Sequence, residues 1–325
     1  MVGWDEVDEP RRLYLLNWCL LGGAALLLGI CLALSRFSLE IEHDLVRVVA
    51  LAASFAVAGH YFASHRWWAR PAFALISMAQ LDLLFVCGTP LTYIAASAAL
   101  PLQDATLSYW DQHLGLDWTA YYNFSIARPL LLQYACFFYA MIIWPLMGVP
   151  ILLGLTKNYV RLQQFTIACT LTVFATAIIS ALVPAIGTYQ QYGLAAETAS
   201  FKATGYLIQL DRLPLARDGT LRGLNLSQIG GIVTFPSFHA AVAFLTMWGL
   251  WCLWWMRPLA LITMGGMLIA TPLLGGHYFI DVIAGVVVAA VAITVVTRLG
   301  KLSAILPAVQ RPEAVVGLGA SEARA

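Results

Sequence analysis

Charged side chains are scarce in this sequence, at 11% of its 325 residues, and their two signs nearly cancel. Because the formal net charge is only +1, the chain lacks the basic surface that binds nucleic acid, and no nucleic-acid partner is expected. Polar residues are also too few for a water-soluble domain, since 61% of the residues are hydrophobic and the mean hydropathy is +0.79. The composition predicts an all-α integral membrane protein that crosses the bilayer several times.

Cysteines at the spacing of a metal site are absent as well. Each of the six cysteines lies inside an apolar run, where a cysteine behaves as a small packing residue. They are Cys19, Cys31, Cys87, Cys136, Cys169 and Cys252. We therefore expect neither a metal site nor a cofactor.

Long apolar runs predict about eight membrane-spanning helices, because about 20 residues at 1.5 Å per residue cross the hydrocarbon. The runs cover residues 13–34, 46–64, 72–99, 129–155, 162–185, 236–256, 258–274 and 277–298. Eleven of the 18 lysines and arginines fall on the side of the N-terminus, against seven on the other side. The positive-inside rule therefore predicts that both termini are cytoplasmic.

The segment 101–129 is too polar to span the membrane, yet it is rich in tryptophan, tyrosine and leucine. This pattern predicts one or two interfacial helices at the outer surface, with aromatic rings at headgroup depth. Asp111, His113 and Asp117 lie in this segment, and we interpret them as solvated positions on an amphipathic face rather than as a metal cluster.

Two short motifs bracket the hairpin of the sixth and seventh spans. The first motif ends in Ser237-Phe238-His239, and the second runs from Gly275 to Asp281. Since a chain that crosses the membrane and returns ends on the side where it began, His239 and His277 are predicted to meet on the outer side.

The residue types in these motifs suit phosphoryl transfer. His277 and Asp281 are four residues apart at a helix start, so the carboxylate can fix the imidazole tautomer and leave one ring nitrogen free. The alternative is a purely structural pair at the headgroup level. His239 suits the first turn of the other helix, which Thr234 or Ser237 could cap. The N-terminus of that helix is a natural site for phosphate, and Gly276 allows close approach of a ligand.

The segments Pro236-Ser237-Phe238-His239 and Gly276-His277-Tyr278-Phe279-Ile280-Asp281-Val282 resemble two signature motifs of the type 2 phosphatidic acid phosphatase superfamily. The resemblance implies that His277 is the nucleophile that forms a phosphohistidine, that Asp281 orients it and that His239 protonates the leaving oxygen. Ser237 would bind a phosphoryl oxygen.

The same resemblance implies one membrane domain over residues 1–325. Residues 72–298 would form a catalytic core of six helices, residues 1–66 two accessory helices, and residues 299–325 a polar tail. The site would face the extracytoplasmic side.

The motif residues Phe-Pro-Ser-x-His-Ala and His-Tyr-Phe-x-Asp are closest to the inositol phosphorylceramide synthase branch of the superfamily. The chain departs from the superfamily pattern at Ala270-Thr271, where the third motif has Ser-Arg, and Thr271 is kept as a substrate-binding candidate. Arg128-Pro129 imitates the end of the first motif but precedes the wrong helix. Arg217 and Arg222, in the long outer loop, are the candidates for binding phosphate, although a solvated loop would account for both.

These features give a first hypothesis, a phosphotransferase that moves a phospho-headgroup from a phospholipid donor to a lipid alcohol through a phosphohistidine. Membrane lipids would then serve as both donor and acceptor. The alternative is a lipid phosphate phosphatase acting on phosphatidate-like or polyprenyl esters. A more remote alternative is a lipid transporter or scaffold that only displays the two histidines.

Overall fold

The computed structural model describes residues 8–63, 68–198, 201–226 and 230–305, and these residues are almost entirely helical. The helices that follow the predicted spans are α1 (Asp8–Leu34), α2 (His43–Ala63), α3 (Ala69–Ala96), α6 (Pro129–Ala140), α7 (Ile143–Leu155), α8 (Tyr159–Leu182), α11 (Phe238–Leu250), α12 (Arg257–Leu274) and α13 (Phe279–Ile305). The prediction of an all-α, multi-pass membrane protein is confirmed.

Six helical segments in the described part are long and apolar enough to cross a membrane, rather than the eight that were predicted. They are 9–34, 43–63, 69–96, 159–182, 254–274 and 279–299. The predicted span 129–155 is instead broken between α6 and α7, because Pro145 has no backbone N–H to bond the carbonyl of Met141, where α6 ends. The predicted span 236–256 contains α11, whose 13 residues reach only about 20 Å.

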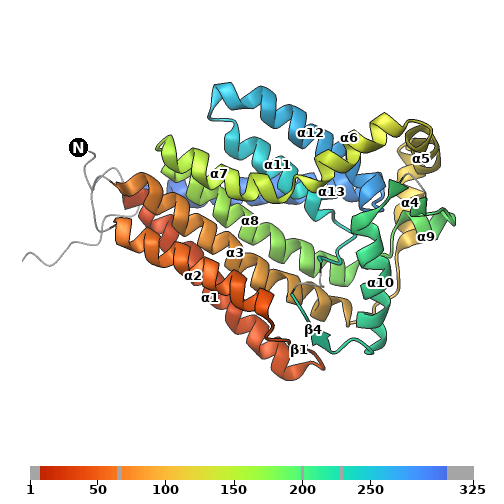
Figure 1. The fold of residues 1–325 in the computed structure, drawn as a ribbon, viewed down its shortest axis with the longest axis horizontal. Helices are drawn as coiled ribbons and strands as arrows, with labels where there is room; N and C mark the ends of the chain where they lie inside the picture. Colours follow the sequence, from red (N-terminus) through yellow and green to blue (C-terminus); the bar gives the residue numbers. More distant parts are fainter. Residues whose placement is uncertain (1–7, 64–67, 199–200, 227–229, 306–325) are drawn as a thin grey trace, which may run out of the picture.

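The spanning helices pack side by side around α3 and α8 (Figure 1). Helix α3 contacts α1, α2, α7 and α8, while α13 packs on α8 and α11. Buried polar bonds also join α1 to the rest of the bundle, since Thr170 of α8 donates to Asn17 and the Gln80 amide of α3 donates to the Tyr14 carbonyl. Of the two helices predicted as accessory, α1 is therefore hydrogen-bonded to core helices, and α2 packs on α3.

Short helices cover one end of the bundle, opposite the N-terminus (Figure 1). These are α4 (Asp104–His113), α5 (Trp118–Ile126), α9 (Thr188–Tyr192) and α10 (Thr204–Asp218), with a hairpin of β2 (Glu197–Thr198) and β3 (Phe201–Lys202). Helices α4 and α5 lie in the segment 101–129, where one or two helices were predicted. Helix α10, by contrast, lies in a region that the sequence suggested was a loop.

A parallel strand pair ties this end to the first helical hairpin. β1 (Ser38–Leu39), between α1 and α2, pairs with β4 (Gly223–Leu224), which follows α10. At the C-terminal side, α13 continues to Ile305 and so passes the predicted core boundary at residue 298. The rest of the predicted tail, from residue 306, lies outside the described residues.

Candidate active site

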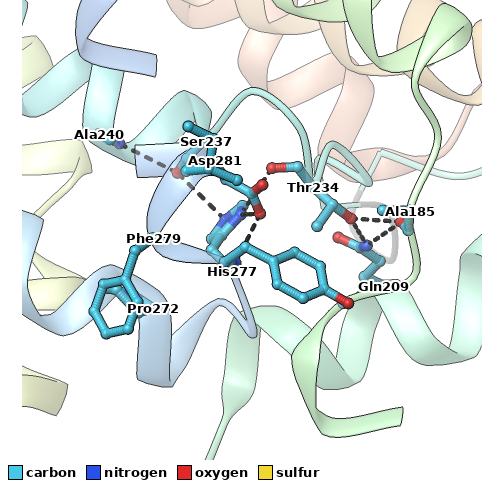
Figure 2. Close-up of polar contacts among 12 residues, drawn as sticks. Ala185, Gln209, Thr234, Ser237, Ala240, Pro272, His277, Phe279 and Asp281 are labelled. Atoms are coloured by element: carbon cyan, nitrogen blue, oxygen red, sulfur yellow. Dashed lines mark hydrogen bonds and ion pairs between the residues drawn. The ribbon is translucent and has the colours of Figure 1, made fainter. Parts of the chain in front are cut away.

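His277 lies between the end of α12 and the start of α13, with its ring buried (Figure 2). Its Nδ1 is 2.8 Å from the carbonyl oxygen of Thr234 and 3.3 Å from Oδ2 of Asp281. A carbonyl oxygen can only accept a hydrogen bond, so Nδ1 carries the ring proton. In the neutral imidazole, Nε2 then presents its lone pair on the opposite edge of the ring, as a histidine nucleophile requires.

Asp281 lies in the first turn of α13 and is fully buried. Its Oδ2 accepts from the Tyr278 amide at 2.9 Å as well as from His277, while Oδ1 has no partner among the described residues. Its backbone carbonyl also accepts from the Ser237 amide at 2.9 Å. Asp281 thus fixes the imidazole and joins the starts of α11 and α13.

Ser237 is the N-cap of α11, and its Oγ accepts from the Ala240 amide. The same Oγ is 3.3 Å from Nε2 of His277 (Figure 2). The N-terminus of α11, with the positive end of its helix dipole, therefore lies beside the Nε2 edge of His277. Gly285 of α13 makes this approach possible, because a Cβ at that position would collide with the Ser237 carbonyl.

His239 follows two residues later and stacks on Tyr139 of α6, with ring centroids 4.2 Å apart and planes 7° from parallel. It is close enough to His277 for the two rings to interact electrostatically. Within the described residues no hydrogen bond to its ring nitrogens is found, so they are open to a ligand. The two histidines of the sequence prediction thus lie in one site.

The turn before His277 depends on glycine. Gly276 has φ +63° and its carbonyl accepts from the Thr188 amide at 2.9 Å, while a Cβ would strike Tyr206 of α10. Thr271, in the last turns of α12, is buried, and its hydroxyl donates a hydrogen bond to the Met267 carbonyl at 2.7 Å. Its hydroxyl is therefore not directed to the His277 ring in this state.

The arginines proposed for phosphate binding make no contact with His277, Ser237 or Asp281 among the described residues. Nη2 of Arg217 donates to the Leu100 carbonyl at 2.7 Å, and its Nη1 is buried without a partner. Arg222 is exposed beside β4, and its carbonyl accepts from Ser38.

Two acidic residues of α4 accept hydrogen bonds from the residues that directly follow His277. Both oxygens of Asp111 accept at 2.8 Å, from the amides of Phe279 and Ile280, which caps α13. Burial raises the pKa of Asp111, and these two hydrogen bonds oppose the rise. The interpretation of Asp111 as a solvated position is wrong, whereas His113 and Asp117 are indeed exposed.

Asp104 is the second of these acids, and it holds two loops together. It accepts from the amides of Ile186 and Gly187 and, at 3.0 Å, from the hydroxyl of Tyr278, the residue after His277. Burial and the Asp104 carboxylate raise the pKa of Tyr278, so its phenol remains a donor. No motif spacing connects residue 104 with residue 278, and the sequence therefore gave no signal for this contact.

Gln209 of α10 supports the other partner of His277. Its amide donates to the hydroxyl of Thr234 and to the Ala185 carbonyl, and the Thr234 hydroxyl donates to Ala185 at 2.6 Å (Figure 2). Thr234 is therefore held from both sides, which fixes the carbonyl that accepts the His277 proton.

A family model described as the PAP2 superfamily matches residues 105–295, which is more than half of the chain. The chain belongs to the PAP2 superfamily. Members of this superfamily are generally phosphatases or phosphotransferases. Comparison with curated proteins and with solved structures gave no match. The PAP2 match lies inside the predicted core of 72–298, includes both histidine motifs and starts after α3.

Alanine in place of Gly275 is expected to disable the PAP2 site without unfolding the protein. Gly275 has φ −94°, which alanine tolerates, but its Cβ would lie 2.9 Å from Nε2 of His277 and closer still to Cδ2. Because the ring must move, we expect turnover of a phosphate ester to fall at least about tenfold, measured as an initial rate. Gly265→Ala in the same helix is the control, since a Cβ there meets nothing within 4 Å. Equal rates for both variants would contradict the geometry.

Asparagine in place of Asp111 is expected to lower stability by about 1–2 kcal/mol, because a carboxamide has one acceptor oxygen for two amide donors. Thermal unfolding in detergent measures this change. Asp117→Asn is the matched control, since Asp117 caps α5 through a single exposed bond to the Ala120 amide. An equal, small decrease in the unfolding temperature of both variants would show that Asp111 does not stabilise the start of α13.

Proposed function

We propose that this protein is a membrane phosphotransferase that moves a phospho-headgroup from a phospholipid donor to a lipid alcohol through a phosphohistidine on His277. The observation that carries the proposal is the pair of acceptors on Nδ1, Thr234 and Asp281, which leaves the Nε2 lone pair facing the start of α11. Membership of the PAP2 superfamily supports the coarser activity, transfer or hydrolysis of phosphate esters.

In the first step, the Nε2 lone pair of His277 attacks phosphorus and the bond from phosphorus to the diacylglycerol oxygen breaks. His239 gives its proton to that oxygen as it leaves. The buried carboxylate of Asp281 offsets the positive charge that develops on the imidazole. The amides at the start of α11 and the Ser237 hydroxyl bind the phosphoryl oxygens.

In the second step, the hydroxyl of a lipid alcohol attacks phosphorus and the P–N bond breaks, which restores neutral His277. His239, neutral after the first step, takes the hydroxyl proton and is ready for the next cycle. Water in place of the alcohol would give hydrolysis. Burial of His277 and Asp281 limits the access of water and so favours transfer.

We further propose that the branch is the one of inositol phosphorylceramide synthase, with a sphingolipid-type alcohol such as ceramide as acceptor, and that the site faces the extracytoplasmic side. The shared residues Phe-Pro-Ser-x-His-Ala and His-Tyr-Phe-x-Asp and the distribution of lysine and arginine support these points. Arg217, with its unpartnered Nη1, is the first candidate to neutralise the phosphoryl oxygens, and Arg222 the second.

Purified protein in liposomes tests the proposal. The donor is phosphatidylinositol with labelled phosphate, offered with and without ceramide. We expect label in a new ceramide lipid, and little label released to water when ceramide is present. Label that appears only as water-soluble phosphate or inositol phosphate would identify a hydrolase and overturn the transferase assignment.

A further inference from the structure

Two arginines stack on tryptophans at the end of the bundle opposite His277. Arg161 lies in the first turn of α8, with Cζ 4.1 Å from the ring centroid of Trp248. Arg257 is the first residue of α12, with Cζ 5.2 Å from the ring centroid of Trp251, and its Nε donates to the Trp251 carbonyl at 2.9 Å. Because Trp248 and Trp251 are three residues apart at the end of α11, the two guanidinium groups lie in the same region.

These charges lack a negative partner. The ion pairs found among the described residues involve Arg47, Lys202, Arg212 and His277, and none involves Arg161 or Arg257. Arg161 is half-buried and makes no hydrogen bond within the described residues, although a guanidinium carries five N–H donors. Guanidinium donors left open in this way can form charge-assisted hydrogen bonds, and this points to an anion supplied from outside the chain.

The packing of the helices fixes this arrangement. Gly249 in the last turn of α11 lets Phe165 of α8 approach, and a Cβ there would be 3.1 Å from the Phe165 ring. The first turn of α8 is thereby held against Trp248. The N-termini of α8 and α12 lie in this region as well, and their dipoles add to its positive potential.

We infer that this cluster, formed by Arg161, Trp248, Trp251 and Arg257, binds the phosphate of an anionic phospholipid in the leaflet opposite the catalytic site. The bilayer, rather than free phosphate, supplies the ligand because the surroundings suit a lipid. Trp251, Trp254 and Trp255 expose their rings at the turn between α11 and α12, as residues of the membrane interface do. On α12, Leu259 and Ile262 are 52% and 62% exposed and offer an apolar face to acyl chains. The bound lipid would hold the hairpin that carries both histidines.

Native mass spectrometry of the detergent-purified full chain tests this inference, with dioleoyl phosphatidylglycerol titrated as the probe. We expect the wild type to retain one such lipid, and the variant carrying Arg161→Gln and Arg257→Gln to bind it at least about tenfold more weakly. Trp248→Leu keeps both charges but removes the ring on which Arg161 stacks, so it should lose less lipid affinity than the double variant. Thermal unfolding in neutral detergent shows whether each variant is folded. If the double variant does not fold, Arg257→Gln alone, at an exposed site, is tested in its place.

Arg298→Gln is the matched control. Arg298 is also exposed on α13 at the same end and has the same charge, but no ring contact is found for it in the described part of the chain. It should bind like the wild type. Dioleoyl phosphatidylcholine should not compete, and inorganic phosphate at the same concentration should not displace the lipid. Equal binding by the double variant and Arg298→Gln, equal retention of phosphatidylcholine, or displacement by phosphate alone would each overturn the inference.

Discussion

Glutamine in place of His277 is expected to reduce turnover by about 10⁴-fold or more, to the background rate of the lipid ester. Glutamine can still donate a hydrogen bond to the Thr234 carbonyl, so the loop should fold, but it has no lone pair able to form a covalent bond to phosphorus. The rate of headgroup transfer in liposomes, with equal amounts of folded protein, measures this effect.

His113→Gln is the control for that experiment. His113 is exposed on α4 at the same end of the bundle, and its contacts are to Tyr109 of its own helix. This variant should keep wild-type turnover. If His277→Gln retains more than a few per cent of the wild-type rate, the nucleophile has been misassigned.

Glutamine in place of His239 is expected to slow transfer from a natural lipid ester by about 10²- to 10⁴-fold, because an alkoxide leaving group needs a proton. The loss should be much smaller with a nitrophenyl phosphodiester, whose leaving group departs without protonation. The ratio of the two rates, rather than either rate alone, measures the role of the proton donor.

Tyr139→Phe serves as its control, since phenylalanine keeps the ring that stacks on His239. The ratio of rates for the two esters should stay at the wild-type value in this variant. An equal loss for both esters in His239→Gln would mean that His239 positions the substrate and does not transfer a proton.

The central geometry of the site follows from short-range sequence patterns. Four residues separate His277 and Asp281, and this spacing at a helix start places a carboxylate beside an imidazole. Ser237 is a residue type that favours a helix N-cap, and the hairpin of α11 and α12 brings the two motifs together. Each step needs only local geometry and the known length of a spanning helix.

The supporting contacts could not be predicted in this way. Asp104 bonds Tyr278 across 174 positions, and Asp111 bonds Phe279 across 168, so no periodicity links them. An acid on an amphipathic helix is usually solvated, and only the packing of α4 against α13 makes Asp111 buried. The tertiary contact therefore overrides the expectation from composition.

Hydropathy also concealed one helix break and one helix. Residues 129–155 form one long apolar run, so hydropathy predicts one helix there. It takes no account of the hydrogen bond to the Met141 carbonyl that Pro145 cannot donate. Helix α10 was hidden for a different reason, since it lies in a loop region with several charged residues and contains Pro214. Tyr206 and Gln209 from its buried face nevertheless support Gly276 and Thr234.

The most direct test is to capture the covalent intermediate. Wild-type protein is mixed with a phospholipid carrying labelled phosphorus, without an acceptor alcohol, and is quenched in alkali within one turnover. A phosphoramidate on a histidine survives alkali and is lost in acid. We predict label with this behaviour on the peptide that contains His277, attached through Nε2. Turnover with no captured label, or label on another residue, would contradict the account.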